Sequence, residues 1–433
     1  MLPSQRNLQM NESILISVPE EILINILLYL SLSDILNLML TSKTMKTVII
    51  SLSRLWRLKS YQHFTQINNS SGQSVLSWYN KCRIFHNWCK GIFNAKVIIQ
   101  HKTNYMPWLH ISNSDKLYLS VGSELQCFRL NRNGIPYGRT VWSFEVPKER
   151  RYDKRTNDIS RFVVKDNEIV CGNRDGCVAV YETNEHDITP HLLVHIKDCH
   201  EGGNEEVSAV EKIGNTVVTV SNKSSNICFW QLERNSNTSA IYGSSYVSNK
   251  KEYTLPNDIC CKSIAKNTAN DKLALGPSGQ DKPMIFDVNK GIISMTSTFL
   301  NCAKEVRDIQ WLNEFSVAYV TYCGKVQVFD IRSSEVVYQS TDPLLSCLYC
   351  LKTDNDRVIV TGSSEYARCV LYDLRSKYHL QMYFTQKKSS PVYCLHFDST
   401  RLIAAADRGV ATLNFNVNKS NICSRDFSQR FSL

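Results

Sequence analysis

The sequence lacks the motifs around which many enzymes build an active site. It has neither a glycine-rich phosphate-binding loop nor the Gly-x-Ser-x-Gly turn of a serine hydrolase, and only ten histidines occur in 433 residues. Fold alone does not exclude catalysis, because activity depends on local sites. The sequence therefore favours a protein that is not an enzyme, and we expect no bound cofactor.

A zinc site is not indicated either, although the chain has 16 cysteines. Only Cys347 and Cys350 form a Cys-x-x-Cys pair, whereas a structural zinc needs about four converging ligands. The start, MLPSQRNLQMNES, lacks the basic-then-apolar pattern of a signal peptide. Reduced, buried thiols in a cytoplasmic or nuclear protein explain the cysteines best, and we expect no metal.

The basic excess does not form a single patch. The net charge is +10, and the densest basic run, residues 147–155, is interrupted by Glu149 and Asp153. Such runs are usually solvated loops. No recognition helix or aromatic-rich binding signature accompanies it, which argues against a nucleic-acid partner.

One apolar run, residues 22–40, is long enough to raise the question of a membrane span, but local signals divide it. Ser17 and Glu20 have the spacing of a capping box at a helix start. Polar residues 31–34 interrupt the run, and Ser31 or Ser33 can cap a second helix. A third helix is expected over residues 41–58. A charge such as Asp34 is costly at a bilayer centre, so we expect short helices and no membrane partner.

A repeat organises the rest of the chain. Seven strand-like segments each end in an aromatic anchor: Phe128, Tyr181, Trp230, Phe286, Phe329, Tyr372 and Phe415. The last three intervals are 43 residues each, and the first three are 53, 49 and 56. Spacings of about 40 to 45 residues are typical of four-stranded propeller blades. The sequence therefore predicts seven blades.

Each unit divides into four short strands. In the sixth, LYCLKTD, DRVIVTGSS, ARCVLYDLR and KYHLQMYF are expected as the inner to outer strands. Aromatic-Asp pairs recur at Asp287, Asp330 and Asp373, where the carboxylate is expected to accept donors from an adjoining turn. Residues 94–102 are expected to close the ring as the outer strand of the seventh blade, with the C-terminal tail as the competing candidate.

The helical segment resembles an F-box over about residues 16–58. The resemblance rests on VPEEILINILLYLSLSDILNLML and the closing LWR, with Val18 standing where the family usually has leucine. Together with the repeats it identifies the chain as similar to the F-box/WD repeat family. The fold expected is an all-β, seven-bladed WD40-type propeller preceded by a small all-α, three-helix F-box module. The boundaries expected are a flexible tail (1–13), the F-box (14–60), a helical linker (61–90), the propeller (91–418) and a C-terminal tail (419–433).

The resemblance implies a substrate-recognition subunit of an SCF-type ubiquitin ligase. Its partners would be a Skp-type adaptor, a cullin-RING ligase reached through that adaptor, and an unknown protein cargo. The residues expected to form or support the adaptor-binding face are Val18, Pro19, Ile22, Leu23, Ile26, Leu27, Leu30, Leu32, Leu36 and Trp56. The alternative is a WD-repeat scaffold that has no role in a ubiquitin ligase and binds nucleic acid or an acidic partner.

Cargo binding is expected at the end of the propeller where inner strands begin and second strands turn into third strands. Arginines recur at these positions, and their guanidinium groups would bind the phosphate or carboxylate groups of a peptide. The candidates are Arg161, Arg174, Arg307, Arg368 and Arg408. The alternative is that each is a solvated turn residue.

Overall fold

The computed structural model describes residues 18–63, 76–112, 115–151, 156–183, 188–234, 245–295 and 305–417. The chain divides into two compact units. The first, here called the helical unit, comprises residues 1–66 and 73–86. The second, the propeller, comprises residues 67–72 and 87–433.

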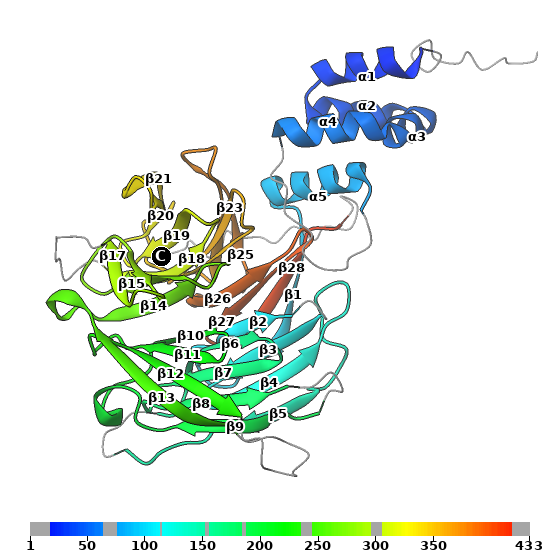
Figure 1. The fold of residues 1–433 in the computed structure, drawn as a ribbon. Coiled ribbons are helices and arrows are strands. Elements are labelled where there is room, and N and C mark those ends of the chain that lie inside the picture. Colours follow the sequence, from blue (N-terminus) through cyan, green and yellow to red (C-terminus); the bar gives the residue numbers. More distant parts are fainter. Residues whose placement is uncertain are drawn as a thin grey trace, which may run out of the picture. The chain divides into compact units, whose positions relative to one another are not determined.

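The apolar run forms two helices, as predicted (Figure 1). Helix α1 (Glu20–Tyr29) begins after Pro19, which is its N-cap and makes no side-chain cap bond; Ser17 lies outside the described residues. Helix α2 (Leu32–Thr41) begins with a capping box, in which Ser31 Oγ accepts from Asp34 N at 3.1 Å and Asp34 Oδ2 accepts from Ser31 N at 3.3 Å. No helix in the described part of the chain is long and apolar enough to cross a membrane.

The segment expected as a third helix is two helices, α3 (Lys43–Ser51) and α4 (Ser53–His63). The chain leaves the helical conformation at Leu52, whose ψ is 70°, and serines flank this break. Serine competes for backbone hydrogen bonds and favours helix ends over helix interiors. Helix α5 (Trp78–Lys90) follows at the predicted linker; residues up to 86 belong to the helical unit and residues from 87 to the propeller.

The helical unit has its own apolar core. Trp56 is 1% exposed, its indole Nε1 donates to the Ile49 carbonyl at 2.8 Å, and its ring packs edge-on against Tyr79 at 5.0 Å. The core is built from all five helices and contains Leu23, Ile24, Leu27, Ile35, Met39, Met45, Ile49, Leu52, Leu55, Trp56 and Cys82. Packing on an internal core fixes which faces of α1 and α2 remain outside.

The described part of the propeller forms seven antiparallel sheets of four strands each, confirming the predicted blade number (Figure 1). Blade 1 contains β2 (Leu109–Ile111), β3 (Lys116–Val121), β4 (Glu124–Arg129) and β5 (Trp142–Glu145). Blade 2 contains β6 (Ile159–Lys165), β7 (Glu168–Asn173), β8 (Val178–Glu182) and β9 (His191–Ile196). Blade 3 contains β10 (Ala209–Ile213), β11 (Thr216–Val220), β12 (Asn226–Arg234) and β13 (Ser245–Thr254).

The remaining blades repeat this order. Blade 4 contains β14 (Cys261–Lys266), β15 (Lys272–Pro277), β16 (Met284–Asp287) and β17 (Ile292–Met295). Blade 5 contains β18 (Val306–Trp311), β19 (Ser316–Thr321), β20 (Lys325–Asp330) and β21 (Glu335–Thr341). Blade 6 contains β22 (Leu348–Thr353), β23 (Val358–Ser363), β24 (Arg368–Asp373) and β25 (His379–Phe384). Blade 7 combines β26 (Val392–Phe397), β27 (Arg401–Ala406) and β28 (Gly409–Asn414) with β1 (Asn94–Gln100). Short 3-10 turns lie at Glu201–Gly203 and Pro256–Asp258.

The aromatic anchors occupy one structural position. Each lies in the third strand of its blade or directly after it, and each is buried, with exposed fractions from 0% at Tyr372 to 7% at Phe128. All six residues of β23 and of β24 are buried, as expected for strands covered on both faces by neighbouring blades.

The aspartates that follow the anchors hold the next turn, as predicted. Asp330 and Asp373 each accept from the backbone N–H two residues further on, at 2.8 and 2.9 Å. Each also pairs with the guanidinium of that residue, Arg332 or Arg375. Hydrogen bonding by Arg332 lowers the pKa of Asp330 to about 2.

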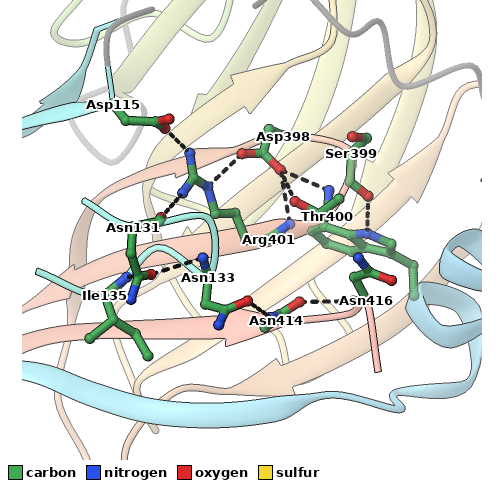
Figure 2. Close-up of polar contacts among 11 residues, drawn as sticks. Asp115, Asn131, Asn133, Ile135, Asp398, Ser399, Thr400, Arg401, Asn414 and Asn416 are labelled. Atoms are coloured by element: carbon green, nitrogen blue, oxygen red, sulfur yellow. Dashed lines mark hydrogen bonds and ion pairs between the residues drawn. The ribbon is translucent and has the colours of Figure 1, made fainter. Parts of the chain in front are cut away.

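Strand β1 closes the ring, as predicted for residues 94–102. It pairs antiparallel with β28 from Asn94–Asn414 to Gln100–Gly409. Figure 2 shows Arg401 of β27 joining blade 7 to blade 1: its guanidinium binds Asp398 at 2.6 Å, Asp115 at 2.5 Å and the Asn131 carbonyl at 3.1 Å. The polar contacts therefore tie the last blade to the first.

The last turn of α5 is part of the propeller. The indole of Trp88 is buried, stacks on Phe415 at 3.7 Å and donates to the Ser399 carbonyl at 3.1 Å. Asn87 Nδ2 donates to the carbonyls of Phe415 and Val417 at 2.7 and 2.9 Å. These residues cover the aromatic anchor of blade 7, which explains why tryptophan and asparagine stand at the end of this helix.

Candidate functional site

Helix α1 exposes an apolar stripe. Ile22, Ile26 and Tyr29 are 52%, 41% and 93% exposed, and exposed Pro19 precedes them. Spacings of three and four residues place side chains on one face of a helix. We call Pro19, Ile22, Ile26 and Tyr29 the α1 stripe. Contiguous exposed apolar side chains of this kind mark surfaces that bind partners.

The other residues expected at the adaptor face lie behind or beside the α1 stripe. Leu23, Leu27 and Trp56 are at most 2% exposed and belong to the core, so they support the face and do not reach its surface. The half-buried members are Val18, Leu30, Leu32 and Leu36. The expected apolar set thus divides into an inner row that holds α1 and an outer row that a partner can touch.

Two exposed residues were missed by sequence reasoning. Tyr29 continues the spacing that begins at Ile22, and Leu40, which is 82% exposed, follows Leu36 by four residues on α2. The helical periodicity contained the signal for both positions. It could not show that Leu40 points away from the core, because that depends on how α2 packs.

Lys59 fixes the carboxyl end of α1. Its side chain is buried and its Nζ donates to the carbonyls of Leu28 and Leu30 at 2.8 and 2.6 Å. A cation at this position satisfies carbonyls that the helix leaves without partners. Burial lowers the pKa of Lys59. The contact holds the end of the α1 stripe in place.

A second candidate surface lies where the inner strands of the propeller begin. A cavity of about 370 Å³, here called the N-end cavity, is lined there by the cationic side chains of Arg161, Arg174, Lys262 and Arg307. Of the described residues that line it, Glu206 is the one carboxylate, and it lies 4.0 Å from Arg174 and 3.7 Å from Lys262. Arg161 also pairs with Asp308 at 2.8 Å and Arg307 with Glu305 at 3.1 Å, which leaves an excess of one positive charge at the cavity.

Aromatic rings hold the guanidinium of Arg307 in place. Its carbon lies 4.7 Å from the Tyr322 ring centre and 5.3 Å from that of Tyr349, and Tyr349 stacks on Tyr393 at 5.8 Å. A cation held over aromatic faces loses less freedom when it binds an anion. Lys262, Tyr349 and Tyr393 were not predicted; they share the inner-strand position of Arg307 in neighbouring blades, which was the available signal.

The five arginines predicted for cargo binding do not all meet. Arg161, Arg174 and Arg307 line the N-end cavity, whereas Arg408 is exposed and donates to Asn104 Oδ1 at 2.7 Å outside its lining. The prediction for Arg368 is wrong. Its side chain is 0% exposed and pairs with the equally buried Asp342 at 2.6 Å, because its position at the start of β24 points it into blade 6.

No metal or nucleophile site stands out in the described part of the chain. No group of three or more potential ligands occurs there, and Cys347 and Cys350 gain no further ligand. His191 and His195 are four residues apart, but on strand β9 this spacing separates side chains by about 13 Å. Burial raises the pKa of the Cys82 and Cys369 thiols to about 12, which suppresses the reactive thiolate.

Comparison with known proteins agrees with this architecture. A domain model described as F-box-like matches residues 15–61, and the seven blades follow it. The chain therefore combines an F-box-like domain with a seven-bladed propeller, as the resemblance to the F-box/WD repeat family predicted.

The chain is similar to F-box/WD repeat-containing protein 4 of two mammals. It is 23% identical to the Homo sapiens protein over 411 residues, covering 92% of each chain, and 24% identical to the Mus musculus protein over 344 residues, covering 77% of each. Among solved structures, the computationally designed Ika8 protein shares the fold, with a TM-score of 0.51, 14% identity, and coverage of 73% of this chain and 98% of that one.

Proposed function

We propose that this chain is the non-catalytic substrate-recognition subunit of an SCF-type ubiquitin ligase in the cytoplasm or nucleus. The observation that carries the proposal is the α1 stripe, an exposed apolar face on an F-box-like domain. The partner that fits it is a Skp-type adaptor, through which a cullin-RING ligase is reached. The names of the relatives, which pair an F-box with WD repeats, support the same assignment.

Binding to the adaptor tests this proposal directly. The full chain and a purified Skp-type adaptor are mixed and passed over a size-exclusion column with light-scattering detection. We expect a complex containing one copy of each protein. If the two proteins elute separately at micromolar concentration, the chain is a propeller scaffold and not a ligase subunit.

The N-end cavity is the proposed cargo site, and an acidic or phosphorylated peptide segment is the proposed cargo. Four cationic side chains line it, and after pairing with Glu206, Glu305 and Asp308 the site retains one excess positive charge. Guanidinium groups bind carboxylate and phosphate oxygens through paired hydrogen bonds, which are stronger than neutral ones. The tyrosine rings beside Arg307 supply apolar surface for the rest of a peptide.

Replacing Arg174 or Arg307 by alanine is expected to weaken binding of acidic peptides. A charge-assisted hydrogen bond contributes about 1.5 to 3 kcal/mol, so each change should raise the dissociation constant at least about tenfold. The measurement is binding to an array of phosphoserine peptides and their unphosphorylated and aspartate forms. Arg408→Ala removes an exposed guanidinium outside the cavity and is the matched control. Equal losses for all three variants would refute a role for this cavity.

A further inference from the structure

A second cavity lies where the inner strands end. We call it the C-end cavity; its volume is about 420 Å³, and residues of β2, β6, β10, β14, β18 and β22 contribute to its lining. Three lysines from three different blades line it: Lys165, Lys266 and Lys352. The proposed adaptor and cargo sites use none of them.

The lining of the C-end cavity has more cationic than carboxylate side chains. Arg161 also lines the C-end cavity, but its guanidinium pairs with Asp308 at 2.8 Å and the two charges compensate. Of the described lining residues, only Glu211 then remains as a carboxylate, and burial raises its pKa. Glu211 and the nearby Asp166 attract the ammonium group of Lys266, but burial and the neighbouring Lys165 outweigh them and lower its pKa.

Burial and charge repulsion disfavour the protonated forms of Lys266 and of two nearby histidines. Burial and the neighbouring Lys165 lower the pKa of Lys266 to about 8, and Lys266 Nζ donates to the Lys212 carbonyl at 2.6 Å. Burial and the charge of Lys352 lower the pKa of His110 and of His396 to about 3. The two imidazoles are therefore neutral at pH 7 and add no positive charge. A bound anion would reduce the repulsion between Lys165 and Lys266.

We propose that the C-end cavity binds a small, soluble, polyphosphorylated molecule. Lysines act as point charges for phosphate oxygens, and three of them line this cavity from separate blades. The lining also contains neutral polar side chains that can donate to phosphate: Thr268, Gln310, Asn313 and Asn355. The inner strands of six blades surround the site, so a free phosphate ester fits it better than a headgroup in a lipid bilayer.

Calorimetric titration of the full chain with inositol hexakisphosphate and with inorganic pyrophosphate tests this proposal. Lys266→Gln and Lys352→Gln are each expected to raise the dissociation constant about tenfold or more, since each removes a charge-assisted contact. Lys352→Arg retains the charge and should retain most of the affinity. Thermal unfolding of each variant checks that the propeller remains folded.

One control separates this site from the rest of the basic surface. Lys387→Gln removes an exposed lysine in the loop between β25 and β26. It is not expected to change the affinity more than about twofold, because exposed charges outside the cavity are screened. The proposal fails if neither probe binds, or if Lys387→Gln weakens binding as much as Lys266→Gln and Lys352→Gln do. It also fails if affinity appears only for vesicles carrying phosphoinositides.

Discussion

Replacing Ile26 by aspartate is expected to lower the affinity for a Skp-type adaptor by at least about a hundredfold, a cost of about 3 kcal/mol that is typical of a central interface residue. Ile26 is 41% exposed in the middle of the α1 stripe, so a partner on this face would bury it. Aspartate removes that apolar contact and places an unpaired charge in the interface. Ile22→Asp is expected to act in the same way. The dissociation constant, measured by calorimetry, reports the loss.

The control for these variants is Ile292→Asp. Ile292 lies on β17 of the propeller and is 53% exposed, close to the 52% of Ile22, so the same chemical change is made at a similar exposure. We expect adaptor binding of Ile292→Asp to equal that of the unmodified chain. If Ile26→Asp binds the adaptor normally, or if Ile292→Asp loses as much affinity, the α1 stripe is not the docking face.

Replacing Arg368 by methionine is expected to lower the free energy of unfolding of the propeller by about 3 to 5 kcal/mol, because it leaves a buried carboxylate without its counter-ion. Asp342 Oδ2 accepts from Arg368 at 2.6 Å and from the backbone N–H groups of Leu344 and Ser346 at 3.0 Å each. Both charged side chains are 0% exposed. Urea unfolding followed by tryptophan fluorescence measures the change.

The double variant Arg368→Met/Asp342→Asn distinguishes the ion pair from a simple packing effect. Asparagine keeps an acceptor for the two backbone N–H groups but carries no charge. The double variant is therefore expected to be more stable than Arg368→Met by about 2 kcal/mol, which a double-mutant cycle resolves. Additive losses would show that Arg368 acts through packing alone.

The propeller was predictable because its signals are local and repeated. Seven aromatic anchors, the last four separated by three intervals of 43 residues, predict the third strand of every blade, and residues 94–102 are the closing strand, as expected. The burial of Arg368 could not be predicted in this way. Its sequence position beside a hairpin matches that of Arg174, but only packing decides that one side chain enters blade 6 and the other lines a cavity.

In the helical unit, too, the sequence predicted the helices but not which of their apolar side chains are exposed. Periodicity identified the apolar residues of α1, and the split at residues 31–34 followed from helix-capping chemistry. Periodicity did not distinguish Leu27, which is 0% exposed, from Ile26, which is 41% exposed. Adjacent residues on a helix differ by about 100° in direction, so the positions of neighbouring helices determine which of the two is covered. The break at Leu52, which the flanking serines favour, was not predicted.

Hydroxyl-radical footprinting of the full chain, with and without a Skp-type adaptor, tests the docking face most directly. Tyr29 is 93% exposed on α1, while Tyr137 and Tyr378 are 71% and 72% exposed on the propeller, so all three rings are accessible to the radical in the free chain. We expect the adaptor to protect Tyr29 and to leave Tyr137 and Tyr378 oxidised as before. Unchanged oxidation of Tyr29 in a formed complex, or protection on the propeller instead, would contradict the assignment of α1 as the adaptor-binding face.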